Sequence, residues 1–238
     1  DAAPLTMGID FRILTTADDV APLPEFEQFV WSSDERVSVN MLIAAIIEGG
    51  MAIAGYDGDL LVATGFGFAT RDAHVLHSHY IAVHPDHRNR GVGEALKREQ
   101  AAWCRANGYT AMRWTFDPLQ LANAHLNLEK LGAYGITYHV NHYGTMGGIN
   151  GSLPSDRLTV YWDLVGRRPD VDETVRVEVP MVAPEQISSG APEAVSARLA
   201  LRDAMVPLLA GGWIVTGVSR HDRAYLLGRP VEWKTRQP

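Results

Sequence analysis

A glycine-bearing loop between a strand-like run and a helix-like run constrains this chain more than any other feature. The run Leu76 to Val83 reads as a strand, and residues 94–107 carry the spacing of a helix. Between them, Gly91 and Gly93 permit positive φ angles and a close approach of the backbone to a ligand. The first N–H groups of a helix have no acceptor inside the helix and attract negative charge. The loop therefore predicts a binding site for a phosphate-like group.

The neighbouring patterns predict alternating strands and helices. After Asn107-Gly108 comes a strand at residues 109–116, and then an apolar stripe at Leu121, Ala124, Leu128 and Leu131 that ends at Gly132. Upstream, the patterns predict strands at residues 9–14, 51–56 and 60–69, and helices at residues 24–31 and 39–48, with a helix-start signal at residues 15–18. Downstream, they predict strands at residues 136–141, 158–164 and 175–179, a linker at 180–192, a helix at 193–209 and a hairpin of residues 213–218 and 224–227.

The loop sequence Arg88-Asn89-Arg90-Gly91-Val92-Gly93, which follows a strand ending in Val83-His84-Pro85, resembles the acetyl-CoA pyrophosphate loop of the GNAT N-acetyltransferase superfamily. It differs from Gly-x-Gly-x-x-Gly and from a Gly-Lys-Ser/Thr loop. The resemblance implies an α/β (α+β) GNAT fold with a mixed, mostly antiparallel central sheet flanked by helices. It also implies acetyl-CoA as acyl donor, held by the loop residues and by the strand backbone at Ile81, Ala82 and Val83.

The C-terminal third departs from the pattern of the core. We expect a GNAT core over residues 8–166 and a strand–helix–hairpin appendage over residues 167–238. About seventy residues make a marginal independent core, so the appendage should pack on the acetyltransferase core.

Two histidines are the candidate catalytic residues. His77 and His79 are two positions apart and therefore share a face of the strand. The string from His77 to His84 resembles the corresponding strand of arylalkylamine N-acetyltransferase, which carries paired histidines there. Imidazole has an ordinary pKa of ~6.5 and can take a proton from an amine near neutral pH. Two alternatives stay open: a structural role, and a metal site with His74, His84 or His87, although we expect no metal.

The fourth expected helix departs from the family. Many GNAT enzymes carry a general-acid tyrosine where this chain has Leu128, and an asparagine where it has Leu121. Asn123 and Asn127 could contact pantetheine, and solvated or capping roles are equally open. Substitute acids would be Tyr80, Tyr134, Tyr138 or Tyr143.

The acceptor is the least determined part. The loop from residue 141 to 157 has the length of a lid or binding loop, or of a plain surface loop. Trp114, Phe116 and Asp117 either line the site or belong to the core. An aromatic, histidine-containing pocket suits a small amine better than a basic protein tail.

Composition excludes several classes of function. The 238 residues carry a formal net charge of −7 and no basic cluster, so we expect no nucleic-acid partner. No apolar run approaches the ~20 residues that span a bilayer, so we expect no membrane partner. The single cysteine, Cys104, excludes an intrachain disulfide and favours a cytoplasmic protein in which it is a packing residue. A homodimer is possible.

These observations predict an acetyl-CoA-dependent N-acyltransferase that acetylates a small amine by direct attack of the amine on the thioester. The alternative is a GNAT-fold protein that binds CoA as a sensor or interaction module without catalysis. The histidine pair favours the enzyme, and Leu128 favours the alternative.

Overall fold

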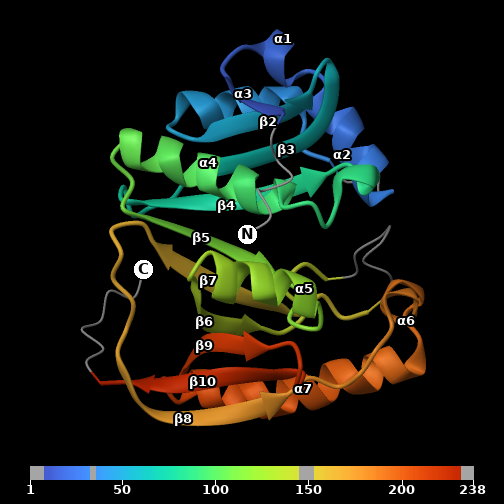
Figure 1. The fold of residues 1–238 in the computed structure, drawn as a ribbon, viewed down its shortest axis with the longest axis vertical. Coiled ribbons are helices and arrows are strands. Elements are labelled where there is room, and N and C mark those ends of the chain that lie inside the picture. The colour runs from blue at the N-terminus through green and yellow to red at the C-terminus, as the bar shows by residue number, and fades with distance from the viewer. Residues whose placement is uncertain (1–7, 33–35, 145–152, 232–238) are drawn as a thin grey trace. The chain divides into compact units, whose positions relative to one another are not determined.

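The computed structural model describes residues 8–32, 36–144 and 153–231 (Figure 1). The chain divides into two compact units, residues 1–113 and 114–238, with the division inside strand β5 (Ala111–Phe116). The two units are described separately below. The domains predicted from the sequence, 8–166 and 167–238, stay a prediction.

The first unit is a sheet with helices on both faces. Its strands lie in the order β1-β2-β3-β4-β5. The pairs β1–β2, β2–β3 and β3–β4 are antiparallel. The elements are β1 (Ile9–Leu14), α1 (Ala17–Val20), α2 (Leu23–Trp31), α3 (Val39–Ile47), β2 (Met51–Asp57), β3 (Leu60–Ala69), β4 (Val75–Val83), the short 3-10 helix η1 (Pro85–His87) and α4 (Val92–Ala106).

Apolar side chains from α1, α2 and α3 cover one face of this sheet. The core there joins Val20, Leu23 and Leu42 of the helices to Ala54 and Phe66 of the strands. Local signals agree with this start of the chain, because the Thr16 side chain accepts a hydrogen bond from the Asp19 N–H and completes a capping box.

Helix α4 covers the other face and runs along β3 and β4 (Figure 1). Its buried side is Val92, Leu96, Lys97, Gln100, Ala101 and Cys104, a helical spacing. Cys104 is fully buried and burial raises its pKa to about 12, in agreement with the packing role predicted for it.

Strand β4 has two irregular features. It pairs with β5 in parallel over three residues only, from Val75–Ala111 to His77–Arg113. Against β3 the register shifts, because Phe66 faces Tyr80 while Gly67 faces Ser78. His79 is thus the extra residue of a β-bulge, a device that changes the direction of the side chains around it.

The second unit contains the end of β5, then α5 (Leu121–Ala124), a π-helical segment η2 (His125–Lys130), β6 (Tyr134–His139), β7 (Arg157–Asp163), β8 (Val171–Glu178), α6 (Pro184–Ser189), α7 (Pro192–Ala210), β9 (Ile214–Ser219) and β10 (Ala224–Pro230). The strand order is β5-β7-β6-β9-β10-β8. The C-terminal strands therefore extend the sheet of β6 and β7, with Gly135 of β6 paired to Val215 of β9.

The sequence predicted nearly all of these elements. Helix α6 was missed, because residues 180–192 read as a linker. The predicted mostly antiparallel sheet flanked by helices is confirmed. Within the described ranges, no helix has the length and apolar character needed to cross a bilayer.

Candidate functional site

The loop before α4 leaves backbone donors available to a ligand. Gly91, the N-cap residue, has φ 82° and ψ −2°, a left-handed conformation that suits glycine. It provides no side-chain cap, and the first hydrogen bond of the helix runs from the Ala95 N–H to the Gly91 carbonyl at 2.9 Å. The N–H groups of Val92 and Gly93 therefore have no acceptor inside the helix.

Packing within the first unit does not explain why residue 93 is a glycine. Its backbone is helical, where glycine costs ~0.5–1 kcal/mol relative to alanine. A Cβ built there would lie 3.7 Å from Ile81 Cδ1 and 3.8 Å from Val83 Cγ2, both ordinary contacts. Neither φ nor crowding by these neighbours requires glycine, so close approach by a ligand is the remaining physical account.

Arg88, Asn89 and Arg90 have different roles in the loop. The Arg88 guanidinium donates to the carbonyls of Val83 at 3.2 Å and Val30 at 3.4 Å, and so fastens the loop to β4 and α2. Asn89 has φ 59° and, like Arg90, is exposed.

Two histidines brace the same loop. The Asp86 N–H donates to His84 Nδ1 at 3.3 Å, and the His84 ring packs on Phe29 with centroids 5.0 Å apart. His87 Nε2 lies 3.3 Å from Asp57 Oδ2. These contacts hold the loop to α2 and to the end of β2.

The backbone of β4 points two N–H groups away from β3. The His84 N–H donates to the Val62 carbonyl at 2.8 Å. Donors alternate along an antiparallel ladder, so the Ala82 N–H also faces β3, whereas the N–H groups of Ile81 and Val83 face the other edge. On that edge, the β4–β5 ladder has already ended at His77.

His77 and His79 lie together on the face opposite α4. Their ring centroids are 6.2 Å apart, and both rings contact Phe68, at 4.7 and 5.7 Å. His79 as a whole is exposed to solvent. Protein atoms around the imidazole ring nevertheless desolvate it and lower the pKa of His79. The neutral form is therefore favoured near pH 7. Among the described residues, no three His, Cys, Asp or Glu side chains are grouped to hold a metal.

Buried polar residues in the first unit escaped the sequence analysis. Glu27 is 2% exposed on α2, and Lys97 is 2% exposed on α4, with its Nζ 2.6 Å from Ser78 Oγ. A signal existed for both. Glu27 occupies an apolar stripe with Leu23, Phe26 and Val30, and Lys97 sits among the buried positions of α4.

In the second unit, the two asparagines differ in environment. Asn123 is exposed and donates to Gln120 Oε1 at 3.0 Å. Asn127 is buried and accepts a hydrogen bond from Trp114 Nε1 at 3.3 Å. Leu128 is fully buried, as its place in the apolar stripe predicted.

The residues at the end of β5 are buried in the second unit. Trp114 and Phe116 are 5% and 6% exposed. Asp117 accepts hydrogen bonds from both terminal nitrogens of Arg198 on α7, one at 2.7 Å. Arg202, one turn further along α7, binds Asp156 through two bonds of 2.8 and 2.9 Å.

The loop predicted at residues 141–157 is described at its two ends, and its glycine-rich part, residues 145–152, lies outside the described residues. His142 and Tyr143 are exposed, with ring centroids 4.5 Å apart. The Tyr143 hydroxyl lies 3.2 Å from Thr115 Oγ1.

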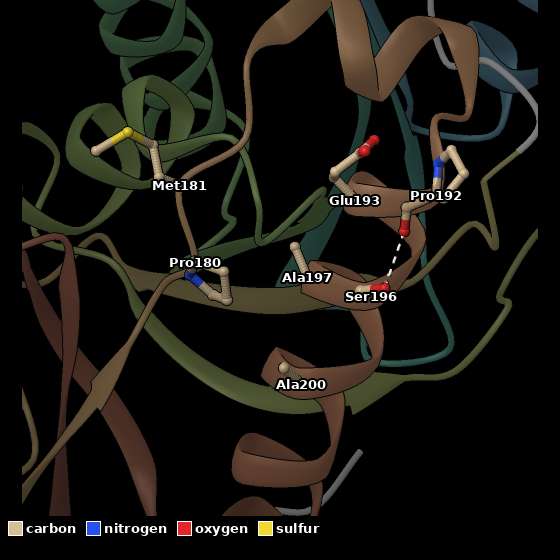
Figure 2. Close-up of a pocket in the computed structure, with 7 residues that line it drawn as sticks. All are labelled: Pro180, Met181, Pro192, Glu193, Ser196, Ala197 and Ala200. Carbon is tan, nitrogen blue, oxygen red and sulfur yellow. Dashed lines mark hydrogen bonds between the residues drawn. The ribbon is translucent and has the colours of Figure 1, made fainter.

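A shallow hollow of about 520 Å³ lies beside α7 (Figure 2). It is lined by Pro180, Met181, Pro192, Glu193, Ser196, Ala197 and Ala200. Among the described residues that line it, none was predicted for the site and Glu193 alone is charged.

Comparisons with known proteins agree with the fold. Residues 18–133 match the sequence model of the acetyltransferase (GNAT) family. A comparison with curated proteins found no significant match.

Among solved structures, the protein yncA of Salmonella typhimurium, solved with its cofactor acetyl-CoA, is 16% identical with a TM-score of 0.54, over 67% of this chain and 96% of that one. The ribosomal-protein-S18-alanine N-acetyltransferase of Escherichia coli is 19% identical with a TM-score of 0.54, over 66% and 94%. The phosphinothricin acetyltransferase of Sinorhizobium meliloti, solved with acetyl-CoA, is 16% identical with a TM-score of 0.54, over 66% and 89%.

At these identities the solved structures show a shared fold, and the sequence model adds the family. Its matched range includes β4, the glycine-bearing loop and α4. Residues 18–133 of the chain therefore belong to the acetyltransferase (GNAT) family.

Proposed function

We propose that this chain is an acetyl-CoA-dependent N-acyltransferase that acts on a small amine. The observation that carries the proposal is the start of α4. There, Gly91 leaves the first turn uncapped, and Gly93 lacks a side chain although its neighbours leave room for one. Such a helix start is suited to a pyrophosphate. The acetyl-CoA bound to two of the structural neighbours supports the same ligand.

The described residues fit acetyl-CoA. The N–H groups of Val92 and Gly93 would bind the pyrophosphate, with the exposed Arg90 close in sequence to add charge. The N–H groups of Ile81 and Val83, which face away from β3, would bind the pantetheine arm and the thioester carbonyl. When bound, acetyl-CoA supplies an acetyl group activated as a thioester.

His77 and His79 would take the proton of the acceptor's ammonium group. The amine must lose this proton before its nitrogen can form a bond to the carbonyl carbon. The lowered pKa of His79, caused by desolvation, keeps its imidazole neutral and able to accept that proton near pH 7.

The four tyrosines that could return a proton to the leaving thiolate differ in their surroundings. Tyr138 already donates to Asp156 Oδ2 at 2.8 Å, and the Tyr80 hydroxyl is buried. Tyr143 is 46% exposed, whereas burial raises the pKa of Tyr134 to about 12. Tyr143 is thus the exposed member of the four candidates.

One observation favours a second candidate function, a protein that binds CoA without catalysis. Leu128 occupies the position of the usual general-acid tyrosine and is fully buried, so it packs in the core and offers no substitute group.

A thiol-release assay with acetyl-CoA and a panel of small amines tests the proposal. Replacing His77 and His79 together with Gln should lower the acetylation rate by ~10²–10⁴-fold, while the affinity for acetyl-CoA stays near that of the wild type. The rate of the wild type should also decrease when the pH is lowered past the value at which the two histidines become protonated.

A near-normal rate and pH profile in the double variant would refute the role of the histidines. Tight binding of acetyl-CoA with no thiol release for any amine would favour the non-catalytic protein.

A further inference from the structure

Three buried oxygen atoms of the first unit form a small polar cluster, and one of them belongs to Tyr80, the residue next to His79. They are Glu27 Oε1 on α2, Thr64 Oγ1 on β3 and the Tyr80 hydroxyl on β4, each with less than 1 Å² of exposed surface. The Tyr80 hydroxyl lies near enough to Glu27 and Thr64 for both to affect its pKa. A carboxylate buried beside a phenol costs stability relative to an apolar pair of side chains, so this cluster indicates a functional reason.

The bulge in β4 connects this group to His79. Side chains normally alternate between the faces of a strand, but the extra residue at His79 places consecutive side chains on one face. The ring centroids of His79 and Tyr80 are 6.0 Å apart, and both rings contact Phe66 at 6.0 Å. Tyr80 therefore lies between the exposed histidine and the buried carboxylate.

The surroundings of Glu27 hold its carboxylate in place. Its second oxygen, Oε2, accepts a hydrogen bond from the Val37 N–H at 3.2 Å. Burial raises the pKa of Glu27, and its neighbours Tyr80 and Arg36 oppose that effect. Among the described residues, Arg36 is the charged group that acts on Glu27, and His79 is the titratable group whose ring contacts Tyr80, with His77 next to His79.

We propose that Glu27, linked through Tyr80, is the carboxylate that accepts the proton His79 takes from the acceptor amine. His79 gives this proton to the Tyr80 oxygen, and the hydroxyl proton of Tyr80 passes to Glu27 Oε1. His79 returns to its neutral form, Tyr80 is unchanged and Glu27 becomes a neutral carboxylic acid. Glu27 is thus a positioning residue for the proton, and this inference rests on the proposed function.

The decisive experiment measures the titration of His79 by NMR in the full chain, with the signal assigned by its loss in the His79→Gln variant. In Glu27→Gln, the amide oxygen can still accept from Val37, but the negative charge is gone. The pKa of His79 should fall by about half a unit or more, because an ionised carboxylate nearby favours the imidazolium. Glu25→Gln, an exposed change on the same helix, should leave the titration unchanged.

Tyr80→Phe provides a second variant that retains the ring contacts with Trp31 and Phe66. It should lower kcat at least ~10-fold and shift the acidic limb of the pH profile, with the KM for acetyl-CoA unchanged. Glu27→Gln should do the same. A merely structural pair would lower stability without moving the pH profile.

An unchanged His79 pKa in Glu27→Gln would overturn the inference, as would a normal pH profile in both variants. If no amine is turned over, the titration alone decides about Glu27. A fall in the His79 pKa would then support the pair, while the missing turnover would count against the proposed function.

Discussion

Lys97 gives the strongest prediction for stability, because it is a lysine inside the first unit. Its Nζ donates to Ser78 Oγ at 2.6 Å, and Ser78 donates in turn to Gln100 Oε1 at 2.9 Å. Burial lowers the pKa of Lys97 from the ordinary 10.5 to about 7. The folded protein therefore prefers the neutral amine, whereas the unfolded chain keeps its proton up to about pH 10.

The sign and size of the effect follow from these two values. Between pH 7 and 10.5 the unfolded state binds more protons at this residue, so the free energy of unfolding should rise with pH in this window. At about 1.4 kcal/mol for each pKa unit, Lys97 destabilises the fold by up to about 5 kcal/mol below pH 7. From pH 6.5 to pH 9.5, the destabilisation that Lys97 causes should decrease by about 3 kcal/mol.

Lys97→Met should remove this dependence. The new side chain has a similar length and no charge, and Ser78 keeps Gln100 as acceptor. The increase in the free energy of unfolding from wild type to variant should be about 3 kcal/mol larger at pH 6.5 than at pH 9.5. Urea unfolding at both pH values, followed by circular dichroism and tryptophan fluorescence, measures the difference, and Lys130→Met, an exposed lysine, is the control.

An equal difference between variant and wild type at both pH values would refute the reasoning. It would mean that Lys97 keeps its charge in the folded protein and that its contacts compensate for burial.

Two further predictions concern the second unit. Leu128→Tyr should lower the free energy of unfolding by ~1–3 kcal/mol, because Leu128 is fully buried and the ring overpacks the core; an unchanged urea midpoint with faster turnover would show that the residue lines the active site. Arg198→Met should cost ~3–5 kcal/mol because it leaves Asp117 buried without its bidentate partner. Adding Asp117→Asn should recover part of that loss in urea unfolding, and purely additive costs would contradict the pairing.

Local signals predicted the parts of the fold that depend on neighbours in sequence. The loop at Gly91 and Gly93 could be recognised because a clear strand pattern precedes these glycines and a clear helix pattern follows them. The hairpin at Asp57-Gly58-Asp59 and the apolar stripe of Leu128 were predicted for similar reasons. Helix α6 could have been found from Pro184 at its first turn and Gly190 in the left-handed conformation at its end.

Contacts between distant residues could not be predicted in the same way. The bulge at His79 depends on the register of β4 against β3, which a single strand does not specify. The pair of Arg198 and Asp117 joins residues 81 positions apart, and the pair of Arg202 and Asp156 joins residues 46 apart. The burial of Glu27 was not predicted, because a charged residue within an apolar stripe is normally expected to be exposed.

Calorimetry of acetyl-CoA binding tests the central claim most directly, with Gly93→Ala as the key variant. The wild type should bind in the micromolar range, about −8 kcal/mol. Gly93→Ala should melt at the same or a higher temperature, since alanine is favoured in a helix and its Cβ fits, yet it should bind at least ~10-fold more weakly. Gly91→Asp and Gly93→Asp should abolish binding through negative charge at the helix start. Wild-type affinity in all three variants would contradict the assignment of this loop.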